Sequence, residues 1–142
     1  MTIDAVATEL RQMALAATDA VGYFAALYTQ ITTRIGESIG NGTFHDPVEM
    51  DAFACSFASL YTGAFTQTIP RPKCWQAAWD VANDGSLLIV QHLLLAINAH
   101  VNHDLPFAVV AAADQRGDID SIRPDFDAVN DVLAAAYVDV QR

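Results

Sequence analysis

Basic residues are scarce in this sequence. Lysine and arginine together number 7, against 17 aspartate and glutamate residues, which gives a formal net charge of −10 at pH 7. A strongly acidic surface repels phosphate backbones and anionic lipid headgroups. We therefore expect neither nucleic acid nor a membrane as a partner. Neutral or cationic small molecules and other proteins stay open.

Cysteine is rarer still, with Cys55 and Cys74 alone in the chain. Two cysteines are too few for a disulfide scaffold, and their spacing matches no zinc motif. The N-terminus lacks the basic start and apolar run of a signal peptide. The longest apolar segment, 87–101, is interrupted by polar residues and is shorter than the ~20 residues that a membrane span needs. These features predict a cytoplasmic protein with free thiols.

Common catalytic motifs are also missing. The sequence contains no Gly-x-Ser-x-Gly elbow, no glycine-rich phosphate loop, no Cys-x-x-Cys pair and no His-Glu-x-x-His segment. Hydrolysis by a Ser/His/Asp triad, nucleotide binding and thioredoxin chemistry therefore have no motif support. No run alternates between apolar and polar residues over enough positions to indicate a β-sheet.

Apolar residues instead recur at helical spacing along the whole chain. Asp46 before Pro47 is a strong helix start, and the glycines at 40 and 42 are typical of a helix end. A chain of 142 residues fits one domain. The sequence predicts a single all-α domain, residues 1–142, in a bundle of about six helices. The expected helices cover residues 3–17, 19–39, 47–66, 74–81, 86–104 and 107–114, and a last one begins near 125 or 127.

The segment 86–104 is the most apolar stretch. Eleven of its first sixteen residues are Leu, Ile, Val or Ala, and they fall on every side of a helical period. A helix that is apolar all round is normally buried, so we expect this one at the centre of the bundle. Pro106 should disturb it near residue 104 or 105, because proline disfavours helical geometry in the preceding residue.

The same segment carries the densest group of polar side chains in the chain, namely His92, Asn98, His100, Asn102, His103 and Asp104. Three of them, His100, His103 and Asp104, lie within ~6 Å along the helix axis, at spacings that let them touch. His92 lies roughly 16 Å from His103 along the axis and needs partners of its own. Asn98 and Asn102 form a second pair four residues apart.

An Asp–His contact orients the imidazole and raises its basicity, which suits acid–base catalysis near neutral pH. We therefore favour a small helical enzyme with an apolar pocket and a hydrophobic small-molecule metabolite as substrate. Its chemistry would be proton transfer, as in cyclisation, isomerisation, dehydration or hydrolysis. The catalytic candidates are His100, Asp104 and His92, and the substrate-binding candidates are Asn98, Asn102, Gln91, Asp51 and Trp75.

Two alternatives stay open. In the first, His100, His103 and Asp104 bind zinc, iron or manganese for a metal-dependent hydrolase, and His45, Asp46 or Asp51 completes the site. In the second, the chain is a non-catalytic binding or assembly subunit and the polar groups form a buried hydrogen-bond network. The apolar residues of the last helix would then dock on a second copy or on a partner subunit.

Three stretches carry a family resemblance. They are QHLLLAINAHVNHDLPFAV at 91–109, the HDP and MDAFACSFASLY run before it, and PDFDAVNDVLA at 124–134. Over about residues 44–139 the chain resembles an uncharacterised bacterial family, the domain of unknown function numbered 5995. The resemblance implies an all-helical fold and supplies no reaction. It singles out an N-x-H-x-N-x-D pattern, which matches Asn98, His100, Asn102 and Asp104. His103 lies outside that pattern, which weakens a three-ligand metal site.

Overall fold

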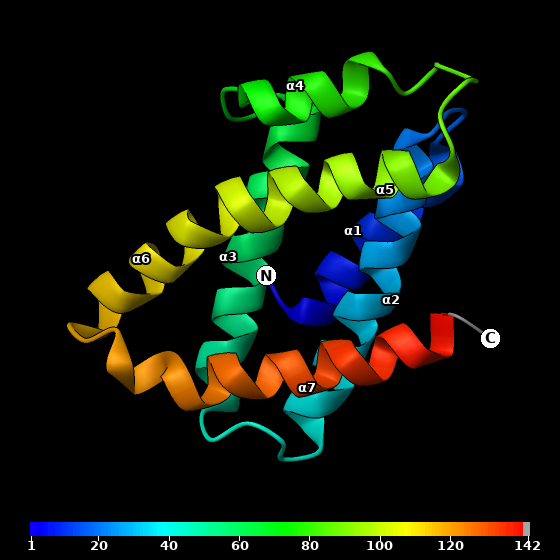
Figure 1. Cartoon of the computed structure of the whole chain (residues 1–142). Coiled ribbons are helices and arrows are strands. Elements are labelled where there is room, and N and C mark those ends of the chain that lie inside the picture. Colours follow the sequence, from blue (N-terminus) through cyan, green and yellow to red (C-terminus); the bar gives the residue numbers. More distant parts are fainter. Residues whose placement is uncertain (141–142) are drawn as a thin grey trace.

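The structure, a computed structural model, describes residues 1–140, without the side chains of residues 137, 139 and 140. The described part is helical and contains no strand, which confirms the all-α prediction (Figure 1). Because α5, η1 and α6 are continuous, it has six helical rods. The elements are α1 (Ile3–Ala16), α2 (Val21–Gly40), α3 (Pro47–Thr66), α4 (Lys73–Asp80), α5 (Ile89–Asn98), a π-helical turn η1 (Ala99–Asp104), α6 (Leu105–Arg116), a 3₁₀ turn η2 (Asp120–Ile122) and α7 (Arg123–Val140).

The boundaries of α3 follow directly from local chemistry. The Asp46 carboxylate accepts the backbone N–H of Glu49 at 3.0 Å, and Pro47 occupies the first helical position. The helix ends at Thr66, followed by Gln67 in the left-handed region with φ of 58°. The predicted start and end of this helix are both confirmed. At the end of α2, Gly42 has φ of 82°, a conformation that favours glycine.

The core lies where α1, α2, α3 and α4 meet. Figure 1 shows α5, η1 and α6 as one long rod across the front, with α7 below it. The main cluster joins side chains from six elements, and its largest buried members are Val6, Leu10, Phe24, Tyr28, Tyr61 and Trp75. A smaller cluster of Ile35, Phe44 and Met50 packs against residues of α7.

The segment 86–104 is not the buried centre of the bundle, so this prediction is wrong. The helix begins at Ile89 and packs with one face against α2, α3 and α4. The buried side chains on that face are small or polar, namely Ala96, Ala99, His100 and Asp104. Large aliphatic residues are exposed instead: Leu88, Ile89, Val90, Leu94 and Val101. Alanine allows close approach of neighbouring helices, so average hydropathy predicted burial of the wrong side chains.

The rod Ile89–Arg116 is long and apolar enough to cross a membrane by length and composition. The same composition occurs in a helix that packs one face against its own domain. Here that face carries the buried polar residues His100 and Asp104, which bond to each other and to α4. Those contacts favour a helix packed within this domain over a membrane span.

The last helix, α7, leaves some of its apolar side chains exposed, including Leu133 and Val138. This is compatible with the expectation that the helix docks on a second copy or partner, which stays a prediction. The chain end at Gln141–Arg142 lies outside the described residues.

One buried carboxylate ties α7 to the start of α3. Asp125 is only 4% exposed. Its two oxygens accept the backbone N–H groups of His45 at 2.7 Å and Asp46 at 2.8 Å. Asp46 also pairs with Arg116 at 2.6 Å, which brings the end of α6 to the same corner. This corner closes the lower end of the bundle.

We predict that Asp125→Ala lowers the free energy of unfolding by about 1.5–3 kcal/mol, because it removes hydrogen bonds to a charged group. Urea unfolding followed by circular dichroism measures the change. The matched control is Asp127→Ala, which removes an exposed carboxylate two residues later and should change stability by less than about 0.5 kcal/mol. Equal losses in the two variants would contradict the anchoring role.

Candidate functional site

The candidate site is built on η1, a wider turn inside the α5–α6 rod. The backbone N–H of Leu105 bonds to the carbonyl of His100, five residues back rather than four. Proline 106 follows at once, and its ring would clash with the carbonyl four residues earlier in a regular helix. Single π-helical turns of this kind are frequent at functional sites. The predicted disturbance before Pro106 is therefore present, as a widened turn rather than a break.

The centre of the site is the carboxylate of Asp104, which is 1% exposed. Three ring N–H groups contact it. His100 Nδ1 lies 2.9 Å and Trp75 Nε1 2.8 Å from Oδ2, and His103 Nδ1 lies 2.9 Å from Oδ1. The predicted His100–Asp104 contact is thus confirmed, and α4 adds a donor from 29 residues earlier.

Five aromatic rings surround the His100 imidazole. The ring of Phe57 stacks on it, with centroids 3.8 Å apart and planes 5° from parallel. Four further rings lie at centroid distances of 4.8–6.0 Å, those of Tyr28, Phe24, Tyr61 and Trp75. His100 itself is 3% exposed. The imidazole is therefore held in one orientation by packing on its faces and by Asp104 at one nitrogen.

The other ring nitrogen of His100 has no partner. Since ionised Asp104 can only accept hydrogen bonds, Nδ1 of His100 carries the proton and donates it. In the neutral ring Nε2 is then an acceptor with a free lone pair. This atom is buried and makes no hydrogen bond, and the hydroxyl of Tyr61 is in the same condition. Such groups are rare in native proteins and call for an explanation, catalysis or an unseen ligand among them.

Burial and hydrogen bonding determine the charge states of His100 and Asp104. Burial lowers the pKa of His100 below 6.5, and the bond to Asp104 offsets this only in part. For Asp104, burial raises the pKa, but the hydrogen bonds from His100, His103 and Trp75 outweigh it, so the pKa lies below 3.8. At neutral pH the site therefore holds a neutral imidazole against an ionised carboxylate.

Two other candidates lie elsewhere on the rod. His92 is eight residues before His100, about 12 Å along the axis, and its ring lies 6.3 Å from that of Tyr23. Asn98 and Asn102 bond to each other at 2.6 Å on the exposed face. The structure does not bring these three side chains together with His100.

The remaining substrate-binding candidates make structural contacts. Gln91 accepts the backbone N–H of Leu88 at 2.7 Å, which caps the start of α5. Asp51 accepts the backbone N–H of Ile3 at 2.8 Å and holds the start of α1. Trp75 is fully buried, donates to Asp104 and places its ring beside that of His100.

The geometry does not favour a metal site. Nδ1 of His100 and Nδ1 of His103 each bond to an oxygen of Asp104. These atoms therefore bond to one another and do not point together at a shared ion. No group of three potential ligands is placed to bind a metal ion within the described residues. One of the residues proposed to complete the site, Asp46, is also distant. Asp46 pairs with Arg116, and it precedes Phe57, which stacks on His100, by eleven residues or about 16 Å of α3.

Sequence reasoning missed the aromatic shell around His100. Phe57 and Tyr61 are four residues apart, so they share one face of α3, and this spacing predicts a common face against the core. Nothing in the sequence indicates that this face meets His100, which is about forty residues away. Tyr28 and Phe24 come from α2 and show the same spacing.

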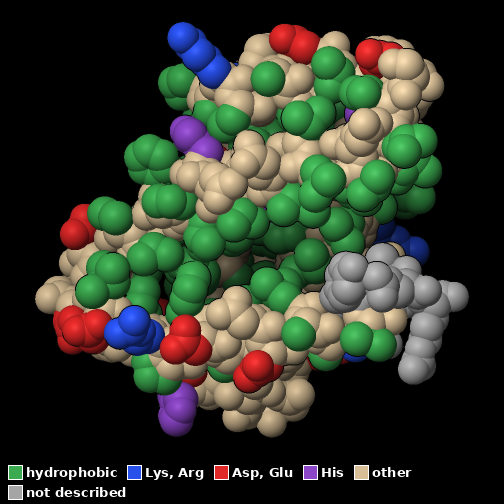
Figure 2. Space-filling model, viewed as in Figure 1, with side chains coloured by type: hydrophobic (Ala, Val, Ile, Leu, Met, Phe, Trp, Pro, Cys, Tyr) green, Lys and Arg blue, Asp and Glu red, His purple; other side chains and the backbone are tan. Residues whose placement is uncertain are grey.

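An apolar pocket adjoins this shell. Figure 2 shows a hollow lined by hydrophobic side chains between the α5–α6 rod and α7. A cavity of about 80 Å³ lies there between α1, α2, α3 and α7. Two of its lining residues, Tyr28 and Phe57, also contact the His100 ring. The other lining side chains are apolar apart from Thr32: Ile3, Ile31, Ile35, Met50, Phe53, Ala54, Val129 and Leu133.

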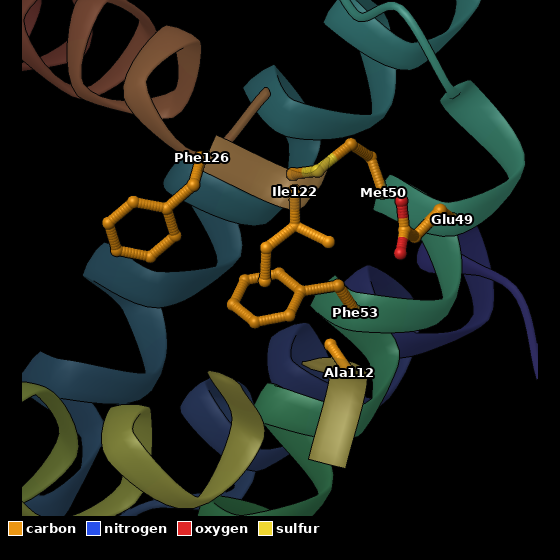
Figure 3. A pocket seen from close by; sticks show the side chains of 6 residues that line it. All are labelled: Glu49, Met50, Phe53, Ala112, Ile122 and Phe126. Atoms are coloured by element: carbon orange, nitrogen blue, oxygen red, sulfur yellow. The ribbon is translucent and has the colours of Figure 1, made fainter. Parts of the chain in front are cut away.

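A second pocket lies beyond Phe53, between α3, α6 and α7 (Figure 3). Figure 3 shows Phe53, Ile122 and Met50 grouped around it, with Ala112 below. Its one ionisable side chain, Glu49, pairs with Arg116. This pocket therefore offers no free group for catalysis.

We predict that Trp75→Phe lowers the free energy of unfolding by about 1–3 kcal/mol, because it leaves the buried Asp104 carboxylate short of one donor. Urea unfolding measures the change. Trp79→Phe is the matched control, since Trp79 stacks on Trp75 and packs on Phe65 and Arg71, whereas the indole donor to Asp104 belongs to Trp75. That control should lose no more than about 1 kcal/mol. A larger loss in the control than in Trp75→Phe would contradict the importance of the indole bond.

We also predict that stability falls as the pH drops below about 6.5. His100 has a lower pKa in the folded protein than in the unfolded chain, so in this range the unfolded chain binds more protons. Asp104 adds a further loss below about pH 3.8, because its folded pKa is lowered too. His100→Gln should reduce the slope between pH 6.5 and 5 by up to about 1.4 kcal/mol per pH unit.

Urea unfolding at half-unit pH steps measures this slope. The control is His45→Gln, which removes an exposed imidazole and leaves the contribution of His100 in place. An unchanged slope in His100→Gln would show that burial of the neutral ring does not control acid stability.

Comparison with known proteins places the chain in a family. Aminopeptidase N of Streptomyces lividans is 31% identical over 51 residues, a segment that covers 36% of this chain and 6% of that enzyme. No solved structure matches the chain. The model of the family of unknown function DUF5995 matches residues 3–142, well beyond the stretches that carry the sequence resemblance. The chain therefore belongs to the DUF5995 family, whose function is unknown.

Proposed function

We propose that the protein is a small acid–base enzyme in which Nε2 of His100 is the base and Asp104 orients the ring. The observation that carries this proposal is the unpartnered Nε2 atom, buried on an imidazole whose other nitrogen is fixed by a carboxylate. A structural histidine would gain from a partner at both nitrogens. A base needs one nitrogen free.

The electrostatics support the same role. The pKa of His100 is lowered, so the ring is unprotonated and able to accept a proton at neutral pH. When Nε2 takes a proton from a bound molecule, the imidazolium lies 2.9 Å from the ionised Asp104, which stabilises its charge. Asp104 keeps its own negative charge because two further donors, Trp75 and His103, hold it.

The apolar pocket beside Phe57 and Tyr28 provides a route to the imidazole. Both side chains line the pocket and contact the His100 ring, and Phe57 is only half-buried. A rotation of Phe57 would open space beside the imidazole, through which a molecule in the pocket could approach Nε2 in the plane of the ring. The lining is almost entirely apolar, so the substrate would be a hydrophobic small molecule. The reaction would be a proton transfer such as isomerisation, cyclisation, dehydration or hydrolysis.

The surroundings of the site are consistent with the other expectations. No lysine or arginine contacts the imidazole or lines the pocket among the described residues, so an anionic substrate would find no counter-charge. Cys55 and Cys74 are free thiols, in keeping with the expected cytoplasmic location. A metal-dependent mechanism has no comparable support from the geometry.

Diethyl pyrocarbonate, which acylates unprotonated imidazole nitrogens, tests whether Nε2 is a reachable base. We expect slow modification of His100 in the folded protein, located by peptide mass spectrometry, and faster modification in Phe57→Ala. Phe65→Ala is the matched control, because Phe65 lies on the same helix and packs against Trp79 instead of His100. It should not accelerate the reaction at His100.

The same proposal predicts turnover that depends on His100. Wild-type protein incubated with a hydrophobic metabolite extract should convert at least one compound, followed by liquid chromatography and mass spectrometry. His100→Gln should reduce that rate by about 10²–10⁴-fold. His103→Gln, which replaces the partly exposed donor to the other oxygen of Asp104, should retain most of it. A His100 that is modified only after unfolding, in both the wild type and Phe57→Ala, would refute the catalytic role and leave a structural network.

A further inference from the structure

Two buried polar atoms in the site lack partners, and they have complementary hydrogen-bonding capacity. They are Nε2 of His100 and the hydroxyl of Tyr61, the only such side-chain atoms found in the described residues. With Nδ1 protonated, Nε2 can only accept a hydrogen bond, whereas a tyrosine hydroxyl can donate one. The two rings are neighbours, with centroids 6.0 Å apart and planes tilted by 64°.

The two atoms nonetheless do not bond to each other. Packing holds both rings. Phe57 stacks on His100, while Tyr61 is fully buried against Phe24 at 5.1 Å and Trp75 at 4.9 Å. Leaving a buried polar group unsatisfied costs about 1–3 kcal/mol. Two such atoms on neighbouring rings can both be satisfied by one further group that bonds to each of them.

We infer that the site binds a neutral, apolar molecule through a hydroxyl group, which donates to Nε2 of His100 and accepts from the hydroxyl of Tyr61. This inference rests on the proposed function, because the hydroxyl would present its proton to the catalytic base. It makes Tyr61 a substrate-binding residue, which neither the sequence patterns nor the family match assigns.

Hydrogen-bonding capacity separates a hydroxyl from a ketone, a carboxylate and an ammonium group. A ketone or a carboxylate only accepts, so it would leave Nε2 without a donor. An ammonium group only donates, so it would leave the tyrosine proton unpaired.

Charge disfavours an anionic group as well. Burial raises the pKa of Tyr61, and burial lowers the pKa of His100, so both groups are neutral at pH 7. The site therefore holds no positive charge to balance an anion. A small cavity of about 80 Å³ next to the shell further favours slender or short molecules.

The test uses three probes of the same chain length, 1-hexanol, 2-hexanone and hexanoate. Binding to the full chain is followed by nuclear magnetic resonance through the indole N–H of Trp75, which lies within the same ring cluster. We expect 1-hexanol to bind about two- to tenfold more tightly than 2-hexanone, as one additional neutral hydrogen bond gives. Hexanoate should not bind at pH 7.

The variant Tyr61→Phe should weaken 1-hexanol binding about two- to tenfold and leave 2-hexanone no better bound than 1-hexanol. It should fold normally, because the hydroxyl that it removes has no partner. Tyr23→Phe is the matched control, since Tyr23 is 41% exposed and faces His92 instead of His100. It should bind 1-hexanol as the wild type does.

Equal affinities for 1-hexanol and 2-hexanone would overturn the inference, as would unchanged 1-hexanol binding in Tyr61→Phe. Absence of 1-hexanol binding at saturating concentration would also overturn it and indicate that only water occupies the site. None of these results bears on the reactivity of Nε2. If one of these results is obtained and His100 still reacts with diethyl pyrocarbonate, the proposed base stands. Its substrate then belongs to another chemical class.

Discussion

The structure depends on one buried charge. Asp104 carries a carboxylate away from water, and no lysine or arginine side chain pairs with it among the described residues. Isolated buried charges are very costly, so this one persists only because three ring N–H groups solvate it. Two donors belong to η1 and the third belongs to α4. The requirement to solvate one carboxylate therefore fixes the short helix α4 against the long rod and aligns the imidazole at the same time.

This arrangement also explains why His100 lies in an aromatic shell. Large rings have apolar faces that tolerate an imidazole without offering it a hydrogen bond, so they can fix its orientation and keep Nε2 unpaired. Phe57 at 3.8 Å and Tyr28 at 4.8 Å enclose the ring in this way, and both also face the apolar pocket. Orientation by a carboxylate and enclosure by aromatic faces together hold a neutral imidazole next to a hydrophobic cavity.

The parts of this structure that follow local rules were predictable from the sequence. The Asp46–Pro47 start of α3 and the His100–Asp104 contact depend on residues within four positions of each other. The donor from Trp75 and the stacking of Phe57 depend on long-range packing, which no local pattern encodes. The wrong placement of the 86–104 helix has the same origin. The inner face of this helix is the one that α2 and α4 pack against. The small alanines on that face let these helices come close, whereas leucines would hold them apart.

The wide turn at η1 also sets the rotational phase of the whole rod. Five of its six buried residues, Ala96, His100, Asp104, Ala108 and Ala112, recur every four residues, and the sixth is Ala99 beside His100. In a regular helix each step of four rotates a residue by about 40°, so the series would drift by about 160° and leave the inner face. One extra residue in a turn reverses about 100° of that drift. The π-helical turn thus acts as a phase correction, and the rod presents a single inner face to the bundle from α5 to the end of α6.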